Sequence, residues 1–412
     1  MTAPRVDIFT DPRAYTDPQR WHAVAARLRR EDPVAWIEVP DFDPFWAVTR
    51  HADVLELERQ PERFLNTIES VLAPAAFRPK NGGIQIPFKT LIHMDGAQHR
   101  AYRNLTNDWF KPGELRRTLQ PRIEELARRF VERMAELGGA CDFALDVARY
   151  YPLHVIMSVL GVPESDEPLM LDLTQKLFGA DDPDFGVGND LEKRVAVMMQ
   201  LVGYFQRMTA DRRERPGDDL ASVIANGRVD GAPLPDLETL GYYIIVATAG
   251  HDTPSSTLAG GLEALTRAPD QLRALQRDPA GIDNAVEEMI RWVTPVRHFM
   301  RWAQEDTVLR GKRIAKGDGL LMSYLSANRD EEVFSEPFAF DAARANASSH
   351  LAFGTGVHFC LGANLARLEL AAFFRVLLPR LESLELTGPT EYTAATFVGA
   401  PKRVPIRYRL RG

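Results

Sequence analysis

One of the chain's two cysteines, Cys360, lies in a glycine-rich stretch, 353–362, that leads into an apolar segment, 363–378, with helical spacing. A helix N-terminus favours a thiolate, because its free N–H groups and macrodipole attract negative charge. The glycines let the backbone pass close to a flat, bulky group and turn N–H groups toward the sulfur. One thiolate in an apolar setting suits a metal that already has four other ligands. An inert, buried cysteine is the alternative. However, a ten-residue stretch with Phe, Gly, Gly, His, Cys and Gly at these six places occurs by chance only about once in 10⁸ windows.

A second candidate centre is Gly250-His251-Asp252-Thr253-Pro254, in the middle of a predicted helix from an N-cap at Asp236 to about Thr266. Such a helix is roughly 45 Å long and crosses the core. Pro254 cannot bond the carbonyl of Gly250, so we expect a local widening at Gly250. Thr253 can donate a hydroxyl to a small ligand there, and Asp252 can relay protons. A plain proline kink in a structural helix is the alternative.

Both stretches resemble the cytochrome P450 family. Residues 353–362 are similar to its haem-binding signature, with Phe353 and Gly354 beside the cofactor and Cys360 as axial ligand. The resemblance implies haem b on a thiolate, which favours O–O cleavage. Asp252 and Thr253 resemble the family's acid–alcohol pair. Pro254 departs from the family pattern, which has a small hydroxyl residue there, and this puts proton delivery in question.

Further residues agree with the resemblance. His99 and Arg103 share a helix face, which alone indicates only a solvated surface; the resemblance implies that they bind the haem propionates. It assigns the same role to Arg301 and His358. Glu288 and Arg291 form an ordinary i,i+3 pair; with Arg344 they resemble the family's buried structural network, which holds the haem loop and is not catalytic.

The whole chain, 1–412, is expected to be one domain with the cytochrome P450 fold: mainly α, with haem between the long central helix and the Cys-bearing loop and helix. A small β portion is expected near 34–50, beginning with a hairpin, and near 296–325. Helices are expected at 18–30, 51–57, 115–137, 143–160 and 190–215.

The composition limits the function classes. The net charge of −7 argues against nucleic-acid binding. Two cysteines exclude a disulfide framework, a zinc cluster and a cysteine-ligated iron–sulfur centre; Cys141 receives no role. The N-terminal sequence has no signal-like apolar run, and no apolar stretch is long enough to cross a membrane. We expect a cytoplasmic monomer.

The irregular stretch 66–90 combines prolines and glycines with isolated apolar residues, and it resembles the loop that roofs the substrate pocket. All candidate pocket residues are apolar, three of them aromatic, which favours a compact hydrocarbon-like substrate. They are Ile68, Val71, Leu72, Phe77, Ile84, Ile86, Phe88, Ile245, Val246, Ala249, Val296 and Phe397.

We therefore expect a haem-thiolate monooxygenase that hydroxylates a monoterpenoid or a small aromatic hydrocarbon with dioxygen. Segments 150–155, 161–171 and 397–407 resemble the bacterial branch that hydroxylates terpineol. The sequence shows no flavin or iron–sulfur module, so the resemblance implies an external 2Fe–2S ferredoxin with its reductase. A peroxide-using relative without the acid–alcohol pair and a non-catalytic haem sensor are the alternatives.

The ferredoxin would need a docking surface, and a local basic patch is one candidate. Scattered solubilising charge is the other interpretation of the same residues, which are Arg100, Arg116, Arg117 and Arg367.

Overall fold

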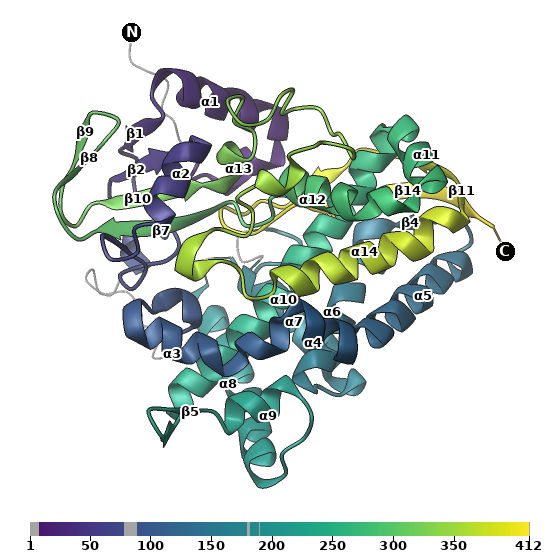
Figure 1. The fold of residues 1–412 in the computed structure, drawn as a ribbon, viewed down its shortest axis with the longest axis horizontal. Coiled ribbons are helices and arrows are strands. Elements are labelled where there is room, and N and C mark those ends of the chain that lie inside the picture. The colour runs from purple at the N-terminus through teal and green to yellow at the C-terminus, as the bar shows by residue number, and fades with distance from the viewer. Residues whose placement is uncertain (1–7, 78–88, 179–181, 189, 412) are drawn as a thin grey trace.

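The computed structural model describes residues 8–77, 89–178, 182–188 and 190–411. Long helices dominate, and the largest sheet lies to one side, on the left in Figure 1, so the prediction of a mainly α fold with a small β portion is confirmed. The helices are α1 (Pro18–Glu31), α2 (His51–Glu58), α3 (Gly96–Asn107), α4 (Pro112–Thr118), α5 (Gln120–Glu136), α6 (Tyr151–Leu160), α7 (Glu167–Phe178), α8 (Leu191–Glu214), α9 (Leu220–Ala225), α10 (Asp236–Arg267), α11 (Pro269–Arg277), α12 (Ile282–Val293), α13 (Tyr324–Ala327) and α14 (Ala363–Arg380).

The largest sheet has the strand order β1-β2-β10-β7-β3. Its first two strands form the predicted antiparallel hairpin, and β10 pairs parallel to β2. The predicted β regions near 34–50 and 296–325 supply every strand of it except β3. Its strands are β1 (Val34–Ile37), β2 (Phe45–Val48), β3 (Phe64–Leu65), β7 (His298–Ala303) and β10 (Gly319–Ser323).

A second sheet, in the order β11-β14-β4, lies near the C-terminus on the right of Figure 1. The prediction that all strands lie near 34–50 and 296–325 was therefore wrong. Polar and apolar residues alternate in β11 and β14, which is the expected period of a half-buried strand. The remaining strands are β4 (Ala140–Asp142), β5 (Arg228–Val229), β6 (Ala232–Pro233), β8 (Thr307–Leu309), β9 (Lys312–Ile314), β11 (Leu381–Leu386), β12 (Glu391–Tyr392), β13 (Pro401–Arg403) and β14 (Pro405–Leu410).

Two predicted helices are each split near a proline. The expected helix 115–137 divides into α4 and α5, and Pro121 lies in the first turn of α5. The expected helix 143–160 divides into a short π-helical turn, η6 (Ala144–Ala148), and α6, with Pro152 in the first turn of α6. Proline lacks an N–H and fits best in a first turn, where no intrahelical hydrogen bond is lost, so each of these two prolines lies just after a helix start.

The central helix α10 has 32 residues and begins after Pro235, so Asp236 is its first residue rather than its cap. It contacts α6, α7, α8, α12 and α14, and most of its side chains are buried. The helix is continuous through Pro254. A Cβ on Gly250 would stand 2.5 Å from a side-chain carbon of Ile156, so the missing side chain lets α6 approach. A widening at Gly250 stays a prediction.

Among the described residues, no helix combines the length and the apolar character needed to cross a bilayer.

Candidate active site

Cys360 lies two residues before Gly362, the N-cap of α14. Its own N–H donates to the Phe353 carbonyl at 2.9 Å, which closes the loop. Burial by surrounding protein raises the pKa of the thiol, while hydrogen bonds from the backbone at Gly362 and Ala363 and the charges of Arg103 and Arg367 lower it. The backbone N–H groups and the two arginines thus offset part of the burial, which on balance leaves the pKa of the thiol raised. Cys360 as a whole residue is nevertheless exposed.

The Cys loop is pressed against α2. Gly354 and Gly356 have φ angles of +62° and +66°, a region that favours glycine. A Cβ on Gly356 would stand 2.7 Å from the backbone oxygen of Glu58. Both glycines are therefore required by backbone geometry as well as by any group that approaches the loop.

A clamp of charged and aromatic side chains holds the Cys loop from the α12 side. Arg367 donates to Glu287 through Nε at 2.5 Å and Nη2 at 3.0 Å, and His350 lies 3.1 Å from the same carboxylate. The Arg367 guanidinium lies 4.6 Å from the ring centre of Phe353. Burial raises the pKa of Glu287, but hydrogen bonds from His350 and Arg367 lower it more, so the pKa falls to about 2. This clamp fixes both ends of the loop.

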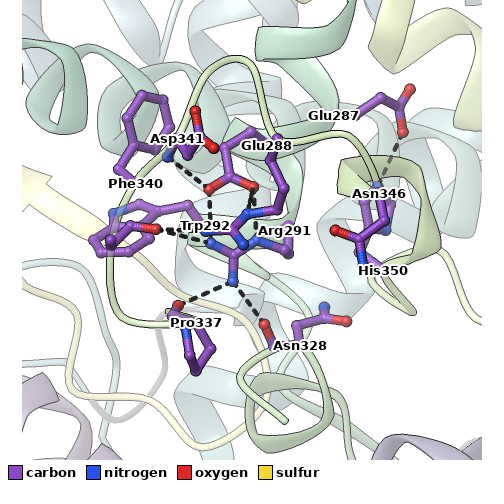
Figure 2. Close-up of polar contacts among 12 residues, drawn as sticks. Glu287, Glu288, Arg291, Trp292, Asn328, Pro337, Phe340, Asp341, Asn346 and His350 are labelled. Atoms are coloured by element: carbon purple, nitrogen blue, oxygen red, sulfur yellow. Dashed lines mark hydrogen bonds and ion pairs between the residues drawn. The ribbon is translucent and has the colours of Figure 1, made fainter. Parts of the chain in front are cut away.

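The predicted network lies next to this clamp (Figure 2). Arg291 donates to both oxygens of Glu288 at 2.7 Å, and its remaining N–H groups reach the carbonyls of Asn328 and Pro337. Arg344 donates to Glu288 at 3.0 Å. Glu288 and Arg291 are completely buried. The structure therefore brings the three predicted residues together, and their partners are loop carbonyls, which suits a structural role.

Donors gather on another side of the Cys loop. The rings of His99 and His358 are 4.2 Å apart, and His358 lies 3.4 Å from Asp95. Burial and nearby cations lower the pKa of His99 to about 4, so it is a neutral N–H donor at neutral pH. Burial also lowers the pKa of Arg103, which has no carboxylate partner among the described residues.

Arg301, which was predicted to bind a haem propionate, already has partners within the protein. Its guanidinium donates to Glu58 at 3.2 Å and to the Met300 carbonyl at 3.0 Å. Tyr324 also donates to Glu58 at 2.5 Å. Burial raises the pKa of Glu58, and its second oxygen has no protein partner. Arg301 has Glu58 as its counter-charge, so a role toward a propionate stays a prediction.

These residues fit a large, flat, dianionic group such as haem. Cys360 supplies one sulfur that accepts from the backbone at Gly362 and Ala363, and Arg103 is a half-buried cation without a carboxylate partner in the described part of the chain. Ala249, midway along the mostly buried helix α10, is exposed, and so is Phe359 in the Cys loop, so both border open space. Cys360 would bind the iron, with His99, Arg103 and His358 toward the propionates.

Asp252 and Thr253 lie in the middle of α10, as predicted. The Thr253 hydroxyl donates to the Ala249 carbonyl at 2.8 Å, one turn earlier on the exposed face. Burial raises the pKa of Asp252, the charge of His251 lowers it, and its Oδ2 is buried without a protein partner. The acid and the alcohol are adjacent, and neither is consumed by a structural salt bridge with a lysine or arginine among the described residues.

The candidate pocket residues are only partly brought together. Phe397 lies 5.3 Å from Phe299, ring centre to ring centre, and Val296 forms a bridge with Val398, so these residues form one apolar cluster. Ile68 is 57% exposed. Ile84, Ile86 and Phe88 lie outside the described residues, as does the side chain of Phe77. The half-buried residues are Val71 and Ile245, and the buried ones are Leu72 and Val246.

Sequence reasoning missed Arg297, which holds the C-terminal turn beside Phe397. Its guanidinium is buried, lies 4.2 Å from the ring centre of Tyr15 and donates to the carbonyls of Thr393 and Ala395. Burial lowers its pKa to about 10. It also missed Glu58 and Asp95, whose partners are remote in sequence. No local pattern marks such residues.

The proposed basic patch is partly neutralised. Arg117 pairs with Glu114, and Arg367 pairs with Glu287. Arg100 and Arg116 are exposed. The patch therefore has fewer free charges than the sequence suggests.

Comparison with known proteins agrees with this site. The family profile described as Cytochrome P450 matches residues 282–401. Cytochrome P450-terp of Pseudomonas sp is 43% identical, with 96% of this chain and 95% of that protein covered. Linalool 8-monooxygenase of Pseudomonas putida is 32% identical, with 96% and 97% covered. The crystal structure of CYP108D1 from Novosphingobium aromaticivorans has a TM-score of 0.90 at 41% identity and covers 97% of both chains.

A relative this similar over nearly the full length shows that the chain belongs to the cytochrome P450 family. It is thus an oxygen-incorporating oxidoreductase that carries haem b on a cysteine thiolate. The predicted family, fold and cofactor are confirmed, while the roles of individual residues remain predictions.

Proposed function

We propose that the protein hydroxylates a compact apolar molecule, a monoterpenoid or a small aromatic hydrocarbon, with dioxygen and electrons from a 2Fe–2S ferredoxin. The observation that carries this proposal is the pair in the middle of α10: Asp252 has an unpaired buried oxygen, and Thr253 follows it directly. A monooxygenase needs delivered protons, whereas a peroxide-using enzyme or a sensor does not need such a pair.

Each residue has a separate task. Bound haem supplies dioxygen binding and O–O cleavage through the thiolate of Cys360. Thr253 shares its hydroxyl proton with the Ala249 carbonyl at rest, so its oxygen lone pairs can accept from a donor. Because burial raises the pKa of Asp252, this carboxyl can hold a proton closer to neutral pH than an exposed one. Asp252 thus passes protons inward, and Thr253 positions them.

The substrate class follows from the apolar cluster of Val296, Phe299 and Phe397 and from the relatives. Linalool 8-monooxygenase is named for a monoterpene alcohol. CYP268A2 of Mycobacterium marinum, solved in complex with pseudoionone, has a TM-score of 0.89 at 33% identity. Both support a terpenoid for this chain over a charged substrate.

Three measurements test the proposal. Terpineol, linalool and an alkylbenzene are titrated into the ferric holoenzyme, and a complete low-to-high-spin shift with one of the terpenoids is expected. Oxygen-18 from labelled dioxygen is expected in the hydroxylated product. Thr253→Ala is expected to lower the product formed per NADH several-fold with ferredoxin and its reductase. Full coupling in this variant, or peroxide-driven turnover equal to ferredoxin-driven turnover, would contradict the monooxygenase cycle.

The reductase chain has its own test. Reduction by a small acidic ferredoxin is expected to slow as ionic strength rises, because Arg100 and Arg116 are exposed. A rate independent of salt would contradict docking at this surface.

A further inference from the structure

His251 precedes the acid–alcohol pair, and its ring is almost fully buried. Its Nε2 lies 2.8 Å from the carbonyl oxygen of Arg149, and its Nδ1 lies 3.2 Å from the hydroxyl of Thr174 on α7. The same Nδ1 is 3.4 Å from Oδ1 of Asp252. One ring nitrogen is therefore occupied by the fold, and the other faces the acid.

The bond to Arg149 decides the position of the ring proton. A carbonyl only accepts, so Nε2 of His251 must carry a hydrogen. In a neutral ring, Nδ1 then presents a lone pair. The Thr174 hydroxyl can donate to this lone pair, but the lone pair also lies 3.4 Å from Oδ1 of Asp252 and repels that oxygen when the carboxylate is ionised. A proton on Nδ1 or on Asp252 turns this repulsion into an attraction. The two side chains are thus arranged to share one proton.

The other oxygen of Asp252 has no structural use. Oδ2 is buried and accepts no hydrogen bond from protein, which is costly for a group that serves only the fold. Burial raises the pKa of Asp252, and the positive charge of His251 lowers it. Burial is the larger effect, so the pKa of Asp252 is raised, and its carboxyl has one oxygen toward the ring and one available to another donor.

A hollow of about 90 Å³, with both apolar and polar residues in its lining, adjoins the pair on the side of α10 that faces η6, α7 and β13. His251 and Asp252 line it together with Arg149, Gln175 and Lys402. One water needs roughly 10–15 Å³ of such space, so several waters fit. The Nε–H of Arg149 is also buried without a protein partner. A buried donor and a buried acceptor on one hollow are the groups that such waters would satisfy.

The guanidinium of Arg149, which lines the hollow, contacts the rings of Tyr150 and Phe185 and has no carboxylate partner among the described residues, but arginine does not release its proton. The other charged groups on the surrounding elements have partners of their own, which leaves the pair as the proton-holding group at the hollow. They are Lys402 with Asp182 and Asp184, His154 with Glu167, Lys176 with Asp172, and Asp146 with the Asp142 N–H.

We propose that His251 is a positioning residue that holds a proton on Nδ1 and passes it to Asp252, which delivers it toward Thr253. Water in the adjoining hollow then returns a proton to His251. In the step, the Nδ1–H bond of the imidazolium breaks and an O–H bond forms on Asp252. Asp252 then releases the proton toward Thr253, and a hydronium ion in the hollow restores the imidazolium. No electron moves in these steps. The inference rests on the proposed function, because it requires Asp252 to be the proton-delivering acid.

The first variant is His251→Gln, whose amide can still donate to the Arg149 carbonyl but cannot store a proton. We expect product formed per NADH to fall about five-fold or more, with a larger solvent deuterium isotope effect. Burial of Asp252 would then be uncompensated, so the alkaline limb of the pH profile should move to higher pH. Ser256→Ala, on the same hollow, is the control and should leave both unchanged.

An infrared titration of the holoenzyme gives a readout independent of turnover. The protonated-carboxyl band of Asp252 is identified by its loss in Asp252→Asn. In His251→Gln this band should persist to a pH about one unit higher, a tenfold change in proton affinity. His251→Asn, which places an amide near the former Nδ1, is the second variant if the first does not fold with thiolate-bound haem.

The outcomes separate the two proposals. Unchanged pH profile, isotope effect and infrared band in the folded His251 variant would overturn the role of His251, while uncoupling in Thr253→Ala would still support the proposed function. Full coupling in Thr253→Ala would overturn the proposed function itself. In the wild type, a carboxyl band lost in one step at the ordinary pKa of aspartate would also overturn the shared proton.

Discussion

Replacing Glu288 with glutamine should destabilise the fold, because its carboxylate serves two buried arginines. Its oxygens accept from Arg291 at 2.7 Å, from Arg344 at 3.0 Å and from the Asp341 N–H at 2.9 Å. A glutamine keeps one acceptor oxygen and turns an NH₂ group toward the guanidinium donors. Breaking a buried ion pair costs about 3–5 kcal/mol. This is a large part of the roughly 5–15 kcal/mol of a typical native protein.

The melting temperature gives the measurement. An unfolding entropy of about 2.1 cal/mol/K per residue over the chain's 412 residues makes the loss roughly 3–6 °C. Thermal unfolding of the haem-loaded protein, followed by calorimetry, should show it. The matched control is Glu114→Gln, which has the same i,i+3 spacing to Arg117 but an exposed partner, and it should not shift the midpoint. Equal midpoints for the two variants would refute the reasoning.

Three further predictions concern the loop, the clamp and the central helix. Gly356→Ala adds a backbone clash at 2.7 Å to the strain of a positive φ and should reduce the fraction of protein with thiolate-bound haem in its carbon monoxide spectrum, whereas Gly311→Ala, with a positive φ in open space, should not. The pKa of Glu287 is lowered from 4.5 to about 2, so its ionised carboxylate contributes about 3 kcal/mol to the free energy of unfolding above pH 4.5, and this contribution is lost as the pH falls toward 2. Glu287→Gln should flatten this pH dependence in urea unfolding. A variant with the same pH dependence as the wild type would contradict Glu287 as its cause. Gly250→Ala should destabilise the fold by about 1–3 kcal/mol, because the new Cβ would clash with Ile156. Ile156→Ala should relieve that clash, so a double-mutant cycle should give a favourable coupling energy. Purely additive effects of the two substitutions would contradict the clash.

The local patterns predicted most helices and the first hairpin, because their signals are periodic and lie within a few residues. Their limits were also local. Pro121 and Pro152 were available as helix-start signals within segments read as continuous helix. The alternation in β14 was also present in the sequence. Alternation does not identify a strand's partners, however, and β14 pairs with both the nearby β11 and the remote β4.

The sequence by itself determined the family and the fold class, since one cysteine in a glycine-rich loop before a helix is a rare and chemically specific arrangement. It predicted Cys360 as the haem ligand. It also identified Glu288, Arg291 and Arg344 as a set. Only the tertiary structure decided the remote partners of the polar side chains: Arg301 with Glu58, Arg367 with Glu287, and His251 with the Arg149 carbonyl. Desolvation and pairing depend on which atoms of remote segments meet, and no spacing along the chain encodes that.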